Sequence, residues 1–231
     1  MILPLALALA TLVPTPADTV TAGTLSLALT AGADTVDNYV VAGGERRLAI
    51  TYIQTVSEAD DGYLIVQENI RTGGQVVSLD SILVARRSLA TVWHGDVTPV
   101  GSRHVAFDGR RVRGTVVDSL GEATPVDEAI PSGLFDYSIA MMVANLLPLE
   151  EGYEATLATY DIHRGPQFVH VNVSGTEEVT VGGARFDAWR MDVDFGGPPV
   201  TRWVDRATRR ELRVEVELGE RRMVSEARHP G

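Results

Sequence analysis

Most of the chain after Arg47 alternates between apolar and polar residues with a period of two. In Leu212 to Leu218 every second side chain is aliphatic and each intervening one is charged. Successive side chains of a β-strand point to opposite faces, so this pattern predicts one buried face and one solvated face. With ten similar runs, the sequence predicts about eleven strands. The ten runs are Leu48 to Val56, Tyr63 to Ile70, Gln75 to Ile82, Ser102 to Phe107, Arg111 to Val117, Tyr153 to Tyr160, Phe168 to Val173, Glu177 to Val181, Ala184 to Phe195 and Val200 to Asp205.

Residues that tolerate positive φ angles separate several consecutive runs. These pairs are Asp61-Gly62, Gly73-Gly74, Asp108-Gly109 and Gly182-Gly183. Such pairs close tight hairpins, which make consecutive strands antiparallel neighbours. About eleven strands are too many for a flat open sheet. We therefore predict a mainly β protein with a strongly curved antiparallel sheet, a half-barrel.

One segment, Ser132 to Leu147, interrupts the alternation. Its apolar residues cover nearly the whole circumference of a helix, with Ser132 as a possible N-cap, Asp136 in the first turn and Pro148 as the stop. The pattern predicts a helix of about three turns, with Leu134 to Leu147 as its apolar part. A helix that is apolar on most sides must be buried, and the concave face of the sheet is the expected place.

The amino terminus has the pattern of an export signal. Ile2 to Val13 is an almost unbroken apolar run, followed by small residues up to Ala17. This length suits a signal-peptide core and is too short to span a bilayer. We expect a signal peptide at residues 1–17, with a buried first strand or helix as the alternative.

The remaining chain divides into two predicted parts. Residues 18–45 are rich in Thr, Ala and Gly and suggest a loosely ordered lead-in, with one short strand near Leu25 to Leu29. Residues 46–228 form the single half-barrel domain. No later stretch is apolar for long enough to span a membrane, so the mature protein is expected in the periplasm or outside the cell.

Composition excludes several classes of function. The net charge of −11 disfavours nucleic acid as a partner, because such binding depends on clustered cations. The chain contains no cysteine, which excludes disulfides, thiolate metal sites and a cysteine nucleophile. With 45% hydrophobic and 22% charged residues, the composition is that of an ordinary globular protein.

The sequence contains no recognisable catalytic motif. None of the five histidines belongs to a His-Glu-x-x-His motif, although a metal site made of His163 and His170 is conceivable. An acid/base cluster of His163, Asp161 and Glu151 is the strongest enzymatic alternative. No nucleophile elbow or phosphate-binding loop accompanies it. We therefore predict a protein that is not an enzyme and that uses no cofactor and no metal.

Three stretches carry a resemblance to a known family. They are Leu147 to Gly152, Val173 to Met191 and Arg202 to Asp205. Together they resemble domain-of-unknown-function family 3108, found in exported bacterial proteins, across roughly residues 100–225. That family is similar in architecture to the periplasmic lipoprotein-localisation carriers. The resemblance implies a half-barrel with a helix on its concave face and, by analogy, a bound apolar ligand.

Two functions remain open at this point. The first is a non-enzymatic binding protein of the cell envelope that encloses a lipid, acyl chain or other apolar small molecule between sheet and helix. The alternative is a dry-core structural or protein-interaction module, with an unknown protein partner. The candidate ligand-binding residues are the apolar side chains of the helix and of two facing strands. They are Tyr137, Met141, Met142, Leu146, Trp189, Met191, Phe195 and Trp203.

Overall fold

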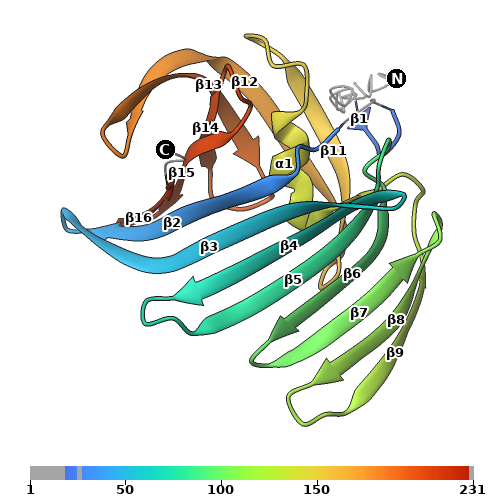
Figure 1. The fold of residues 1–231 in the computed structure, drawn as a ribbon. Coiled ribbons are helices and arrows are strands. Elements are labelled where there is room, and N and C mark those ends of the chain that lie inside the picture. Colours follow the sequence, from blue (N-terminus) through green and yellow to red (C-terminus); the bar gives the residue numbers. More distant parts are fainter. Residues whose placement is uncertain (1–18, 25–27, 229–231) are drawn as a thin grey trace, which may run out of the picture.

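One continuous 16-stranded sheet curves around a short helix in the computed structural model, which describes residues 19–24 and 28–228 (Figure 1). The first nine strands are β1 (Thr19–Val20), β2 (Gly32–Ala42), β3 (Glu45–Ala59), β4 (Gly62–Arg71), β5 (Val76–Ala85), β6 (Thr91–Thr98), β7 (Gly101–Phe107), β8 (Arg111–Asp118) and β9 (Ala123–Ala129). The others are β10 (Phe135–Asp136), β11 (Glu154–Asp161), β12 (Gly165–Val181), β13 (Ala184–Asp194), β14 (Val200–Asp205), β15 (Glu211–Leu218) and β16 (Arg221–Ala227).

The sheet consists of two hairpin series joined side by side. Strands β2 to β9 pair in sequence order, as do β11 to β16, and β16 pairs antiparallel with β2 to unite them. One edge of the sheet is β9. At the other edge, β1 and β10 each pair in parallel with β11. The sheet is thus open, and no hydrogen-bonded ladder joins its two edges.

The predicted mainly β architecture is confirmed, but the strand count was too low. The predicted runs Phe168 to Val173 and Glu177 to Val181 are one strand, β12, in which the register shifts between Val173 and Gly175. A bulge of this kind lets a long strand bend without ending. Six strands, β1, β2, β6, β9, β10 and β16, were missed. In β6 the buried residues include His94 and Asp96, so the inward positions are polar and the apolar alternation is lost.

The predicted loosely ordered lead-in at residues 18–45 was wrong for its second half. Strand β2 has 11 residues and pairs on both sides, with β3 and β16, so the sheet begins well before residue 46. Backbone pairing on both edges compensates for a sequence with little apolar patterning. Residues 28–29 of the expected short strand are not in a strand, and residues 25–27 lie outside the described residues. The predicted signal peptide, residues 1–17, also lies outside them.

The helix exists but is shorter than predicted. A 3₁₀ turn, η1 (Tyr137–Ile139), continues into α1 (Ala140–Asn145). Asp136 is the N-cap, because its Oδ1 accepts a hydrogen bond from the Ser138 amide at 2.8 Å. Residues 135–136 instead form β10, so Ser132 does not cap the helix. Apolar periodicity could not reveal this, since it does not distinguish a buried strand from a buried helix, and Phe135 is fully buried.

The helical segment, residues 137–147, covers part of the concave face of the sheet. Ile139, Val143 and Leu147 are almost completely buried and belong to the main core cluster, together with side chains from β4, β5 and β11 to β15. The expectation that the sheet wraps an apolar helix is confirmed. Within residues 19–24 and 28–228, helices are too short or too polar to cross a membrane.

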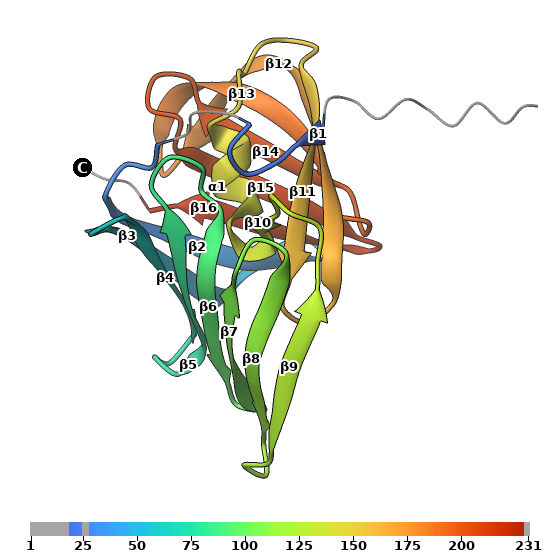
Figure 2. The ribbon, with the colours of Figure 1, turned by 90° about the vertical axis from the view of Figure 1, so that its right-hand side faces the viewer.

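Strands β7 and β8 face the end of β11, where no strand ladder exists (Figure 2). Side chains make the connection there. The rings of Phe107 and Tyr160 meet edge to face at 5.4 Å between centroids. Val105 and Val112 pack with Tyr160 in a separate small core, and the Arg103 guanidinium donates to the carbonyl of Ile162. We call this set of contacts the seam. It holds the curvature of the sheet without closing a barrel.

Ile139→Ala should lower the free energy of unfolding by about 2 to 4 kcal/mol, because it removes buried methyl groups and leaves a cavity. Chemical denaturation monitored by circular dichroism measures the change. Val100→Ala, at a position 75% exposed, is the control and should change stability by less than about 0.5 kcal/mol. Equal effects of the two substitutions would contradict the role of the helix as core.

Candidate ligand cavity

A cavity of about 670 Å³ lies between α1, strands β2 and β3, and the β14–β15 turn. Its apolar wall includes Met141, Met142 and Leu146 from the helical segment and Val36 and Val56 from the sheet. The three helix residues are only half-buried, whereas Ile139 and Val143 on the same segment are fully buried. One side of the helix therefore packs into the core and the other side lines a cavity.

The cavity wall contains a buried arginine. Arg202 is 0% exposed and lies on the inward face of β14, between the inward-facing Val200 and Val204. Its Nε donates to Glu211 Oε2 at 3.1 Å, and its Nη2 donates to Asn145 Oδ1 at 2.9 Å. The remaining nitrogen, Nη1, has no hydrogen-bond partner among the described residues. An unused buried donor is unfavourable by about 1 to 3 kcal/mol, so this atom needs an explanation.

Two more arginines come from the β14–β15 turn. Arg209 has a φ of 62°, a left-handed conformation that is unfavourable by about 1 kcal/mol for a residue with a side chain. Its Nη1 donates to the Leu147 carbonyl at 3.3 Å, just beyond the end of α1. Arg210 pairs with Asp34 on β2. The turn thus places two cations beside the opening between the helix and β2.

The candidate ligand-binding residues divide into three groups. Met141, Met142 and Leu146 line the cavity and also pack against the edge of the main core. Tyr137, Trp189, Met191 and Phe195 pack in or against the main core, and the ring of Tyr137 meets that of Phe195 edge to face at 5.7 Å. That any of these residues binds a ligand stays a prediction.

Trp203 does not join the other candidates, contrary to what we expected. It pairs with Arg190 across β13 and β14, whereas Met191 pairs with Arg202, so the two apolar side chains lie on opposite faces. Trp203 belongs to a second cluster with Val179 and Leu212. Its indole donates from Nε1 to Glu177 Oε1 at 2.6 Å. The period of two explains this placement, because positions 202 and 203 must point apart.

A row of polar residues crosses the concave face next to the cavity. Consecutive members are paired across neighbouring strands from β2 to β7. The row begins in the cavity wall, and in its middle Gln67 Nε2 donates to the Ser138 carbonyl of η1 at 3.1 Å. Its members are Asp34, Gln54, Gln67, Asp80, Asp96 and Arg103.

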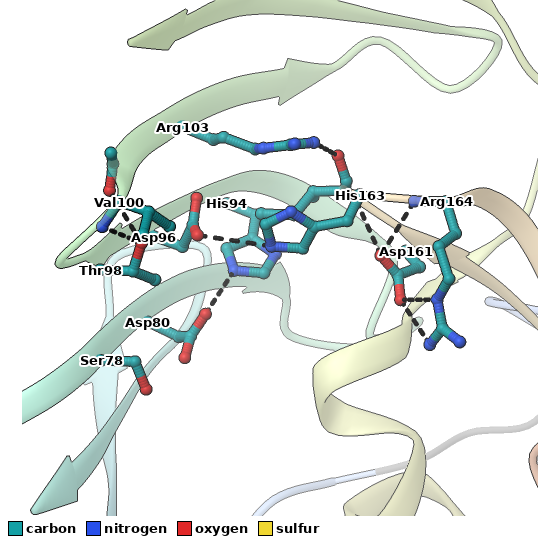
Figure 3. A network of polar contacts seen from close by, with 12 residues as sticks. Ser78, Asp80, His94, Asp96, Thr98, Val100, Arg103, Asp161, His163 and Arg164 are labelled. Atoms are coloured by element: carbon teal, nitrogen blue, oxygen red, sulfur yellow. Dashed lines mark hydrogen bonds and ion pairs between the residues drawn. The ribbon is translucent and has the colours of Figure 1, made fainter. Parts of the chain in front are cut away.

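His94 connects this polar row to the start of the helical segment, and Figure 3 shows its contact with Asp80. Its Nδ1 lies 2.7 Å from Asp136 Oδ2, and its Nε2 lies 3.3 Å from Asp80 Oδ1. Burial alone lowers the pKa of His94, but hydrogen bonds and charge from Asp136 and Asp80 outweigh burial and raise it to about 9. A protonated imidazolium therefore donates to both carboxylates at neutral pH.

The neighbouring His163 lies at the turn between β11 and β12 (Figure 3). Its Nε2 is 3.4 Å from Asp96 Oδ2, and burial raises the pKa of Asp96 despite the nearby His163. Asp161 accepts from the backbone amides of His163 and Arg164, which stabilises the turn. Glu151 precedes β11, at the opposite end of that strand, so the three groups of the enzymatic alternative do not converge.

The conceivable metal site is not assembled. His170 Nδ1 lies 2.8 Å from Thr156 Oγ1, five residues into β12 and away from His163 at the preceding turn. Within the described part of the chain, no group of three or more His, Asp or Glu residues could hold a metal ion.

The model of one family, "Protein of unknown function (DUF3108)", matches residues 38–225. The chain belongs to this family. No curated protein matches the chain. Among solved structures, the hypothetical lipoprotein YmcC from Escherichia coli K12 is similar, with 10% sequence identity and a TM-score of 0.27. The match covers 85% of this chain and 87% of that chain.

The region that matches DUF3108 contains most of the cavity wall. It begins within β2 and ends within β16, and so includes the whole helical segment, β14 and the β14–β15 turn. Arg202, Glu211 and Asn145 all lie inside it. The cavity is therefore formed mainly by the DUF3108 domain itself.

In this DUF3108 domain the buried imidazolium should make stability depend on pH. A pKa raised from 6.5 in the unfolded chain to about 9 means that folding favours the protonated ring. Its contribution is complete below pH 6.5 and is lost as pH rises through about 9. The free energy of unfolding should fall by about 3 kcal/mol over this window. Urea denaturation at several pH values measures it.

His94→Gln should remove most of this pH dependence, because glutamine carries no titrating proton. His104→Gln changes an exposed histidine on β7 and should leave the dependence in place. If His94→Gln unfolds with the same pH profile as the unchanged protein, the assignment of the charge to His94 is wrong.

Proposed function

We propose that this protein is a non-catalytic binding protein that holds a lipid or acyl chain in the cavity beside α1. The observation that carries the proposal is a cavity of about 670 Å³ whose wall includes Met141, Met142 and Leu146, on a helical segment whose other side is buried in the main core. Small-molecule sites have volumes of about 300 to 1,000 Å³ and are lined mainly by apolar side chains. Methionine adapts to ligands of irregular shape because it is flexible and polarisable.

The location that we propose for this activity is the periplasm or the exterior of the cell. The support is the apolar run from Ile2 to Val13, which has the length of a signal-peptide core. A lipid outside the cytoplasm needs shielding from water while it moves, and the apolar side chains of the cavity wall would supply part of that shielding.

The purified protein should bind the neutral dye N-phenyl-1-naphthylamine with an increase in dye fluorescence, and solvent extracts of it should contain lipid by mass spectrometry. Met142→Trp places a larger and more rigid side chain in the cavity wall and should weaken dye binding at least tenfold, or about 1.4 kcal/mol. Leu120→Trp adds the same indole at a position 84% exposed in the β8–β9 turn and is the matched control.

Absence of both dye binding and extracted lipid would refute the proposal. It would favour the alternative of a structural or interaction module. Equal loss of binding in Met142→Trp and Leu120→Trp would place the dye outside this cavity and would also count against the proposal.

A further inference from the structure

The charges in the cavity wall differ in sign from those of the whole chain. Among the described lining residues, three are arginines, Arg202, Arg209 and Arg210, and two are carboxylates, Asp34 and Glu211. The wall therefore has an excess of one positive charge, although the chain has a net charge of −11. In a protein this acidic, a cationic cavity favours an anionic group over a neutral or cationic one.

Arg209 supplies the uncompensated charge. Glu211 pairs with Arg202, and Asp34 pairs with Arg210. Among the described residues, Arg209 forms no ion pair, and its side chain donates a hydrogen bond to the Leu147 carbonyl. The backbone of Arg209 is left-handed, which is unfavourable in free energy for a residue with a side chain, and it places the guanidinium beside α1. A guanidinium in this position remains available to an anion.

Arg202 supplies the unused donor. The side chain is fully buried, its orientation is fixed by Glu211 and Asn145, and Nη1 has no partner in the described chain. The guanidinium fork is suited to bind a second oxyanion while it holds the first. Flexible Met141 and Met142 form the adjacent apolar wall. The cavity thus combines an apolar wall with donors for an acidic headgroup.

Resting on the binding function proposed above, we propose that the ligand is an amphiphile with an anionic headgroup, such as a long-chain carboxylate or alkyl phosphate. The acyl chain lies against Met141, Met142 and Leu146. The headgroup accepts a hydrogen bond from Arg202 Nη1 and is attracted by Arg209. Asn145 and Glu211 keep the Arg202 guanidinium in place and act as positioning residues.

Displacement of N-phenyl-1-naphthylamine by ligands of equal chain length tests this inference. Palmitate and hexadecyl phosphate should displace the dye at concentrations at least tenfold lower than 1-hexadecanol, and hexadecylamine should be the weakest. A preference for palmitate or for the phosphate tells which acidic headgroup fits better. Raising the salt concentration should reduce the preference for palmitate and hexadecyl phosphate over 1-hexadecanol, because salt screens the charge of Arg209.

Arg209→Asn tests the headgroup contact in a way that preserves the turn, since asparagine tolerates a left-handed backbone. This substitution should weaken the binding of palmitate at least fivefold and leave the binding of 1-hexadecanol unchanged. Arg206→Asn is the matched control, because it removes one positive charge from the same turn at an exposed residue outside the cavity wall. This control should change the affinity for neither ligand. Arg202→Gln should weaken palmitate binding further, provided that circular dichroism shows the variant to be folded. If this variant does not fold, the result for Arg209→Asn alone tests the proposal.

The two proposals fail in different ways. If palmitate and 1-hexadecanol bind with equal affinity and Arg209→Asn changes neither affinity, the preference for an anionic headgroup is refuted. The proposal of an apolar ligand in the cavity would still stand. Equal weakening by Arg209→Asn and Arg206→Asn would show only a general charge effect and would also refute it. If the dye and all four ligands fail to bind, the binding function itself is refuted.

Discussion

Burial of the concave face is the constraint on which this structure depends. Alternation along β11 to β15 directs aliphatic side chains to one face of the sheet, and that face must be covered. In an open sheet whose edges do not pair, the cover has to come from another element. The segment from Tyr137 to Asn145 provides it, with Ile139 and Val143 fully buried. Because this segment is short, it covers one part of the concavity and leaves a cavity beside Met141 and Met142.

The helical segment is held differently at its two ends. At its start the contacts are polar, since Asp136 accepts from His94 and the Ser138 carbonyl accepts from Gln67. From Ile139 onward the contacts are apolar and belong to the main core. Polar contacts require specific geometry, whereas apolar packing is less directional. The polar end therefore fixes where the segment starts on the sheet, and the apolar end supplies most of the burial.

Sequence patterning predicted the strands in which aliphatic residues alternate regularly with polar ones, as in Leu212 to Leu218. It failed in β6, because the inward positions carry His94 and Asp96. His94 is satisfied by Asp136, which is 42 residues away, so its burial could not be inferred from neighbours in sequence. The helix prediction failed at its start for a related reason. Phe135 is buried by pairing with β11, and apolar periodicity does not distinguish a buried strand from a buried helix.

The candidate site was predictable in part. The helix residues Met141, Met142 and Leu146 were identified by their apolar character, and they line the cavity. Arg202 was missed, although its position between Val200 and Val204 in an alternating run indicates an inward-facing charge. Its partners, Glu211 and Asn145, lie nine and 57 residues away, so the free Nη1 becomes visible only in three dimensions.

The buried arginine also constrains what the cavity can hold. A wholly apolar ligand would exclude water from the wall and give Arg202 Nη1 no acceptor, which is unfavourable for a charged donor. An amphiphile can bury its chain against the methionines and still offer an oxygen to the guanidinium. Glu211 does not satisfy this donor, because it contacts the Nε and Nη2 edge of the planar guanidinium and Nη1 lies on another edge. The unpaired donor and the uncompensated Arg209 therefore favour the same acidic headgroup, although they lie on different elements of the fold.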